Sequence, residues 1–283
     1  MIKIEHSIFA LPFALLGMIW GAESQFKLLW PTAITILWII VAMVSCRSAA
    51  MAFNRIADRE IDAKNPRTKM RAIPAGLLTL RQSNLFFLGS IAVFVLAAWQ
   101  LNTLALALTP VALLFTLGYS LTKRFTWLCH YVLGLSLGIA PAAAYIATTG
   151  SLEWPVVSLF LAVACWTAGF DIIYALQDDE FDREMNLNSI PSRFGRPRAL
   201  LISRISHGVA IALLVLSGIG HGAGFVYFIG VGVAAALLGY EQSLVRPNDL
   251  SKVNMAFFTL NGYVSMAMFL FALADTWLRL KAR

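Results

Sequence analysis

Residues 154–182 read WPVVSLFLAVACWTAGFDIIYALQDDEFD, and residues 154–170 of this stretch carry no charged side chain. A bilayer core about 30 Å thick requires ~20 mostly apolar residues to span it as a helix, and residues 154–177 meet that requirement. A dense group of acidic residues follows at once. This stretch therefore predicts a membrane-spanning helix that ends in a cluster of carboxylates.

The rest of the chain has the same apolar character. Its 283 residues are 59% hydrophobic and 13% charged, with a mean hydropathy of +0.74. Soluble domains average roughly 45–50% apolar and ~25% charged residues, and disordered chains are poorer still in apolar residues. Both classes are excluded. Three cysteines, Cys46, Cys129 and Cys165, are too few for a disulfide scaffold.

The length criterion predicts nine spanning helices, so we expect an all-α, polytopic membrane protein formed by one domain over residues 1–283. The nine predicted ranges are 7–22, 30–53, 84–100, 103–121, 127–149, 154–177, 199–219, 222–241 and 255–278. Polar cap loops are expected after the second and the sixth of these helices. Prolines such as Pro12, Pro110 and Pro141 do not exclude helices here, because neighbouring helices can satisfy the freed backbone groups.

The loops predict the orientation in the membrane. Most of the 22 lysines and arginines lie in the segments that follow the second, fourth, sixth and eighth predicted spans. Cytoplasmic loops are rich in Lys and Arg, so these segments are expected on the cytoplasmic side of the plasma (inner) membrane. We interpret the net charge of +7 as a sign of this orientation rather than of a nucleic-acid partner.

Nine of the 15 carboxylates lie in the two segments expected to form the caps. The first segment places Asn54, Asp58 and Asp62 at i, i+4 and i+8. The second segment places Asp171, Tyr174, Asp178 and Asp182 at i, i+3, i+7 and i+11. On a helix each set would form one face. Like charges so spaced destabilise a helix slightly, so each face predicts a compensating cation.

The two segments also repeat each other. An offset of 120 residues relates Asn54 to Tyr174, Asp58 to Asp178 and Asp62 to Asp182. This offset indicates two halves, about 1–121 and 127–241, with an additional ninth helix at 255–278. Membrane proteins commonly place a binding site at the interface between such repeats.

Paired aspartates on facing helices are typical of Mg²⁺ sites, which combine one or two carboxylates with substrate phosphates. We expect Asp58, Asp62, Asp178 and Asp182 to be the ligands, with Asp171 as a weaker candidate. Basic residues able to hold phosphate follow each acidic segment and also lie between the fourth and fifth predicted spans. They are Arg67, Lys69, Arg71, Lys123, Arg124 and Arg193. For any one of them, the positive-inside bias is an alternative explanation.

At these residues the chain resembles the UbiA superfamily of intramembrane aromatic prenyltransferases, over essentially its whole length. The family motif N-x-x-x-D-x-x-x-D is met by Asn54, Asp58 and Asp62. Its second motif, D-x-x-x-D preceded by a tyrosine, is met by Tyr174, Asp178 and Asp182. Residues 67–76, RTKMRAIPAG, and 119–126, YSLTKRFT, resemble two further family stretches. Ala72 departs from the pattern, because many members have proline there.

The resemblance implies Mg²⁺-dependent transfer of a polyprenyl chain from its diphosphate to an aromatic acceptor. The four motif aspartates would then be catalytic as metal ligands. Residues implied to bind the diphosphate are Asn54, Arg67, Arg71, Lys123 and Arg193. Tyr119 and Tyr174 could stabilise a cation-like prenyl carbon by cation–π attraction, although both could equally be interfacial anchors. No base for the ring proton is evident.

Arg47 narrows the choice of aromatic acceptor. It lies seven residues before Asn54, within the second predicted span, and an arginine inside a membrane is a functional hypothesis by default. In family members that prenylate 4-hydroxybenzoate, a matching arginine is implicated in binding the acceptor carboxylate. We therefore expect Arg47 and Asn54 to orient 4-hydroxybenzoate in quinone biosynthesis. A menaquinone precursor of naphthoate or futalosine type, and a divalent-cation transporter, remain alternatives.

Overall fold

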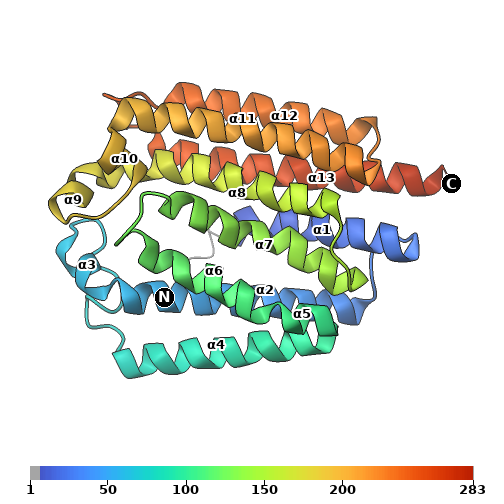
Figure 1. Cartoon of the computed structure of the whole chain (residues 1–283), viewed down its shortest axis with the longest axis horizontal. Coiled ribbons are helices and arrows are strands. Elements are labelled where there is room, and N and C mark those ends of the chain that lie inside the picture. The colour runs from blue at the N-terminus through green and yellow to red at the C-terminus, as the bar shows by residue number, and fades with distance from the viewer. Residues whose placement is uncertain (1–6, 283) are drawn as a thin grey trace.

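The computed structural model describes residues 7–282, and these residues form an elongated bundle of helices (Figure 1). The long helices are α1 (Ser7–Phe26), α2 (Ala33–Ala57), α4 (Leu80–Leu101), α6 (Thr109–Thr122), α7 (Cys129–Thr149), α8 (Trp154–Ala175), α11 (Arg196–His221), α12 (Phe225–Leu244) and α13 (Asn261–Lys281). The short elements are α3 (Arg59–Lys64), α5 (Thr103–Ala107), the 3₁₀ turn η2 (Leu176–Asp178), α9 (Asp179–Glu184), α10 (Ile190–Phe194) and the π-helical η3 (Met255–Leu260).

The all-helical membrane prediction is confirmed. The predicted number of nine spans is not reached, because seven helices of the described residues are long and apolar enough to cross a membrane, and the 14-residue α6 is too short to be one of them. Each of the nine predicted ranges coincides with helical structure, but 103–121 is not one continuous helix. Asn102 caps α5, and a new helix begins after Leu108 with Pro110 in its first turn. Proline is favoured there because its missing N–H would lack a partner in any case.

The bundle core forms around α8, the most deeply buried of the spanning helices, whereas α4 is the least buried. Helix α7 packs closely against α8 because small residues line the contact. A Cβ atom on Gly134 would lie only 2.2 Å from the carbonyl oxygen of Ala164. Small residues of this kind let backbones approach one another in membranes, where dispersion contacts rather than the hydrophobic effect hold helices together.

The two ends of the bundle differ in what covers them. The short helices α3, α9 and α10 gather at one end, to the left in Figure 1, and form the cap predicted from the polar loops. At the opposite end the chain turns between long helices without such a cap. A buried charge network lies near that end and joins Glu23 of α1, His221 of α11, and Asp275 and Arg279 of α13.

Candidate functional site

The first acidic motif lies where α2 meets α3. The prediction that Asn54, Asp58 and Asp62 share one continuous helix face is wrong in detail, because α2 ends at Ala57 and α3 begins at Arg59. Asp58 is the joint between them, with φ −95° and ψ 8°. Backbone hydrogen bonds still run from Asp58 N to Asn54 O (3.0 Å) and from Asp62 N to Asp58 O (2.7 Å). The chain therefore bends at the joint without losing the approximate helical spacing.

The second motif is interrupted in the same way. Asp171 and Tyr174 belong to α8, but Asp178 ends the 3₁₀ turn η2 and Asp182 lies in α9. A 3₁₀ turn winds three residues per turn instead of 3.6 and ends many helices. It redirects the chain across the end of the bundle, so the predicted single face over 171–182 is also wrong in detail.

Both aspartates of the first motif are ion-paired. Asp62 is buried, and Nη1 of Arg71 lies 2.6 Å from its Oδ1 and 2.8 Å from its Oδ2. Asp58 accepts a hydrogen bond from Asn54 Nδ2 at 2.9 Å and pairs with Arg124 Nη2 at 3.3 Å. Burial raises the pKa of Asp58, and the hydrogen bond from Arg124 opposes that shift.

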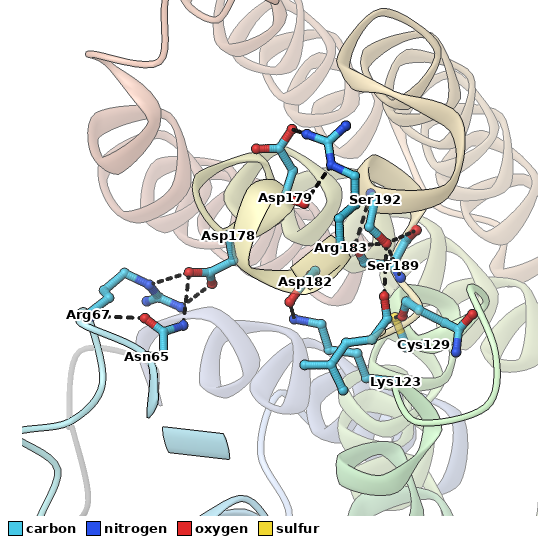
Figure 2. A network of polar contacts seen from close by, with 12 residues as sticks. Asn65, Arg67, Lys123, Cys129, Asp178, Asp179, Asp182, Arg183, Ser189 and Ser192 are labelled. Carbon is cyan, nitrogen blue, oxygen red and sulfur yellow. Dashed lines mark hydrogen bonds and ion pairs between the residues drawn. The ribbon is translucent and has the colours of Figure 1, made fainter. Parts of the chain in front are cut away.

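The aspartates of the second motif also have basic partners, and both partners come from other segments (Figure 2). Arg67 forms a bidentate pair with Asp178, with its Nε 3.0 Å from Oδ1 and its Nη2 against Oδ2. Asn65 Nδ2 contacts the same carboxylate at 3.4 Å. Lys123 Nζ lies 2.6 Å from Oδ1 of the fully buried Asp182. The cap after α2 is thereby joined to the cap after α8.

The four pairs share an asymmetry. Side-chain exposure is 0–21% for the aspartates but 29–43% for their basic partners. Among the described residues, no three acidic, histidine or cysteine side chains converge on one point as a metal site would require. The type of ligand nevertheless suits a hard cation such as Mg²⁺, because the two joined caps provide four carboxylates. In this arrangement the basic side chains supply the positive charge.

A cavity of about 620 Å³ lies in the bundle and reaches this cap. Its polar lining includes Arg47, Asn54, Arg55, Arg71, Tyr119, Asp171 and Tyr174, and the remainder is mostly apolar. Ligand sites are typically cavities of ~300–1,000 Å³ with an apolar wall and a few convergent polar groups. The cavity therefore has the form of a binding site for a molecule with a polar head and an apolar body.

Arg47 differs from the basic residues at the rim. Its Nε is buried and has no hydrogen-bond partner in the part of the chain that the structure describes. The same residues provide no ion pair to its guanidinium. Because an unpaired charge in an apolar cavity is costly, Arg47 is suited to bind an anionic ligand there.

An aromatic wall stands next to the rim. Arg67 Nη1 donates to Tyr174 Oη at 3.0 Å, and the guanidinium lies 5.2 Å from the centre of the same ring. Tyr174 is stacked on Phe257 at 4.1 Å, and Phe257 meets Phe170 edge to face at 5.3 Å. The aromatic faces thus line the cavity close to the Arg67–Asp178 pair.

The sequence of this chain is similar to that of known proteins over most of its length. Residues 10–271 match the model of the UbiA prenyltransferase family. The chain belongs to this family. A 4-hydroxybenzoate octaprenyltransferase of Vibrio cholerae is 32% identical over 263 residues, covering 88% of this chain and 92% of the relative. One from Citrobacter koseri is 32% identical over 256 residues, covering 86% and 88%.

Solved structures agree with this membership. A UbiA homolog from Aeropyrum pernix, solved without ligand, has a TM-score of 0.86 at 32% identity. The match covers 97% of this chain and 99% of the homolog. A UbiA homolog from Archaeoglobus fulgidus, solved with DMAPP and Mg²⁺, has a TM-score of 0.70 at 18% identity, with 97% and 98% coverage. The second likeness shows the fold alone. This UbiA-family chain is a multi-pass integral membrane protein, and its membership of a prenyltransferase family favours the prenyltransferase prediction over the transporter alternative.

Two predicted residues of this UbiA-family site take no part in the four ion pairs of the rim. Arg193 is exposed on α10, with its guanidinium 5.8 Å from the centre of the Phe194 ring. Asp171 lies in the cavity wall and contacts His130, with 2.6 Å between Oδ2 and Nδ1. Their assigned roles, diphosphate binding for Arg193 and metal binding for Asp171, stay predictions.

Sequence reasoning did not anticipate three contacts of the site. Asn65 contacts Asp178 across 113 positions, and Arg124 was set aside in favour of Lys123 although it pairs with Asp58. His130 has no metal-ligand spacing to another histidine, and nothing in the sequence links it to Asp171. Arg124 alone had a usable signal, since it follows Lys123 in the basic loop.

Proposed function

We propose that this protein transfers a polyprenyl chain from its diphosphate to 4-hydroxybenzoate, in a Mg²⁺-dependent reaction of quinone biosynthesis. One observation carries the proposal: an apolar cavity joins a rim of acid–base pairs to an arginine that has no ion-pair partner among the described residues. The rim suits a metal-bound diphosphate, the apolar wall suits an isoprenoid, and the arginine suits the carboxylate of an aromatic acid.

At the rim, Asp58, Asp62, Asp178 and Asp182 would hold Mg²⁺, which when bound offsets the charge of the diphosphate. The A. fulgidus homolog was solved with DMAPP and Mg²⁺, which supports a prenyl diphosphate and Mg²⁺ as ligands of this fold. We infer that Arg67, Arg71 and Lys123 then leave the carboxylates and bind phosphate oxygens. Their half-exposed positions favour such an exchange, since arginine can bind phosphate through two parallel hydrogen bonds and lysine as a point charge.

Electrostatic stabilisation of the leaving group is the main contribution of these residues. Charge accumulates on the diphosphate as the allylic C–O bond breaks, and positive groups already in place stabilise it without reorganisation. The rings of Tyr174 and Tyr119 line the cavity. Their faces can stabilise the electron-deficient prenyl carbon by cation–π attraction.

The acceptor assignment rests on Arg47 and Asn54, which line the cavity from one helix. Seven residues separate them, two helical turns or roughly 10 Å, so Arg47 lies deeper in the bundle than Asn54. A planar hydroxybenzoate bound through its carboxylate to Arg47 would direct its ring toward Asn54 and the rim. The names of the Vibrio and Citrobacter relatives support the same acceptor.

The positive-inside bias of the loops supports a position of the caps, and with them the site, on the cytoplasmic side of the plasma membrane. Soluble 4-hydroxybenzoate would reach the rim from the cytoplasm, and the prenyl donor would remain in the lipid bilayer.

Product analysis by mass spectrometry tests the proposal. Purified protein is incubated with a polyprenyl diphosphate, Mg²⁺, and either 4-hydroxybenzoate, a dihydroxynaphthoate or a futalosine-type compound. We expect prenylated 4-hydroxybenzoate only when Mg²⁺ is present. If only a menaquinone precursor is prenylated, that compound replaces 4-hydroxybenzoate as the assigned acceptor. Mg²⁺ flux into liposomes without prenyl transfer would overturn the proposal.

A further inference from the structure

Asp171 is the one carboxylate in the cavity wall among the residues that the structure describes. The four motif aspartates belong to the rim and are paired with arginine or lysine. Asp171 lies in α8, about one turn before that helix ends at Ala175, and so deeper in the bundle than Asp178 at the end of η2. Its partner is a histidine, so its surroundings differ from those of the other four.

The hydrogen bonds of His130 define its tautomer. The backbone N–H of Ile190 donates to His130 Nε2 at 3.3 Å, so this nitrogen must carry a lone pair. The proton of the neutral ring is therefore on Nδ1, which donates to Asp171 Oδ2 at 2.6 Å. His130 is buried, whereas 22% of the Asp171 side chain is exposed. One oxygen of Asp171 is thereby held by His130 and the other is available to the cavity.

We infer that Asp171 is the general base that removes the ring proton during prenyl transfer, with His130 as its positioning residue. This inference rests on the proposed function. When the allylic C–O bond breaks, its electron pair leaves with the diphosphate. A ring carbon ortho to the hydroxyl then forms the new C–C bond to the prenyl carbon. The C–H electron pair at that carbon returns to the ring, and the proton passes to Asp171.

The position of Asp171 suits this step. It shares the cavity with Arg47 and Asn54, the residues assigned to the acceptor, and with Tyr174 beside the rim. In the proposed ligand-bound state the rim carboxylates are assigned to Mg²⁺, so none of them is free to accept the ring proton. His130 is not itself available as the base, because its Nε2 is occupied by Ile190 and its Nδ1 already carries the proton.

A kinetic isotope experiment with Asp171→Asn tests the inference. The acceptor is 4-hydroxybenzoate, either unlabelled or deuterated at both ring positions next to the hydroxyl. A positioned base contributes about 10²–10⁴-fold in rate. We therefore expect kcat to fall at least about 10²-fold in the variant, with a primary deuterium effect that exceeds the wild-type effect. The Mg²⁺ concentration for half-maximal rate should not change.

His130 variants separate positioning from general structural damage. His130→Ala should lower kcat and reveal the same deuterium effect, whereas His130→Asn, whose amide can still donate to Asp171, should recover much of the rate. Asp249→Asn is the matched control, because Asp249 is in a loop outside the cavity and accepts a hydrogen bond from the hydroxyl of Ser251. It should match wild type in both measurements.

The outcomes separate this inference from the proposed function. If wild type does not prenylate 4-hydroxybenzoate, the proposed acceptor is wrong. If wild type is active and Asp171→Asn stays within about threefold of it, Asp171 is not the base. A raised Mg²⁺ requirement without a larger isotope effect would also overturn the inference, since it would make Asp171 a metal ligand. Should Asp171→Asn fail to fold, the two His130 variants decide by the same criteria.

Discussion

The two ends of the bundle both contain buried carboxylates but compensate them differently. At the capped end, each motif aspartate has one arginine or lysine as its ion-pair partner, and that partner is 29–43% exposed. At the opposite end, Arg279 lies 2.7 Å from Glu23 and 2.9 Å from Asp275 and is 18% exposed. Asp275 also accepts hydrogen bonds from the backbone N–H groups of Gly224 and Tyr227.

This difference indicates what each end does. Buried ions linked to several partners are costly to separate, because removing one partner leaves the others uncompensated. Pairs with one half-exposed member separate more easily, since that member can be solvated or can bind another anion. The network at the uncapped end is therefore a permanent link between α1, α13 and the turn before α12. The pairs at the capped end occupy positions that a metal-bound diphosphate can take over.

The largest expected effect is on catalysis at the capped end. Asp182→Asn keeps the size of the side chain but removes a buried charge assigned to Mg²⁺. We expect kcat/KM to fall by about 10³-fold, comparable to or above the loss of a single preorganised electrostatic group. Thermal unfolding should change little. Glu60→Gln is the control, because Glu60 is an exposed carboxylate of the cap. An equal loss of kcat/KM in this variant would contradict a special role for the buried motif aspartates.

At the uncapped end the largest effect should be on stability. Arg279→Met leaves Glu23 and Asp275 buried without their shared arginine. Breaking a buried pair on one side costs about 3–5 kcal/mol, so the melting temperature in detergent should fall clearly. KM and kcat of the folded fraction should be unchanged. A changed KM for prenyl diphosphate would show that the two ends are coupled.

Lys123→Met should affect both properties, because Lys123 has two roles in this account. Without ligand, Asp182 loses its partner and the protein should melt at a lower temperature. Mg²⁺ should restore much of that stability by binding the free carboxylate, since a ligand of the native state stabilises it by mass action. The KM for prenyl diphosphate should rise about tenfold, the value of one charge-assisted hydrogen bond. No recovery with Mg²⁺ would contradict the exchange of partners.

The smallest effect is expected for Arg193→Ala. Arg193 is exposed and stacks near Phe194 rather than joining the acidic rim, and surface substitutions usually change stability within about 0.5 kcal/mol. Steady-state kinetics should stay within twofold of wild type. A tenfold rise in the KM for prenyl diphosphate would instead return Arg193 to the diphosphate site predicted from the sequence.

The sequence was informative where composition and spacing carry physical meaning. Apolar length located the helices, and the shared end of the bundle followed from the acidic and basic loops. Local backbone geometry was less accessible. The bend at Asp58 and the 3₁₀ turn before α9 interrupt the helical periodicity, and the regular spacing of the acidic residues gave no sign of either. The break at Leu108 had a visible cause in Pro110, but proline alone does not decide between a kink and a new helix.

Pairing partners were the least predictable part of the site. Arg67 and Asp178 are 111 positions apart, and His130 and Asp171 are 41 apart. Such contacts depend on how α3, α7, α8 and α9 are placed relative to one another. The sequence indicated which residues carry charge, whereas the fold determines which charges neutralise each other. The lack of an acidic partner for Arg47 among the described residues could likewise be established only in three dimensions.

The central claim is that the ion pairs of the capped end exchange partners when ligand binds. A structure of the protein with Mg²⁺ and a non-hydrolysable polyprenyl thiodiphosphate tests it most directly. The account predicts that Arg67 and Lys123 move from Asp178 and Asp182 to phosphate oxygens, while Arg279, Glu23 and Asp275 keep their contacts. A bound diphosphate with the Arg67–Asp178 and Lys123–Asp182 pairs still intact would contradict it.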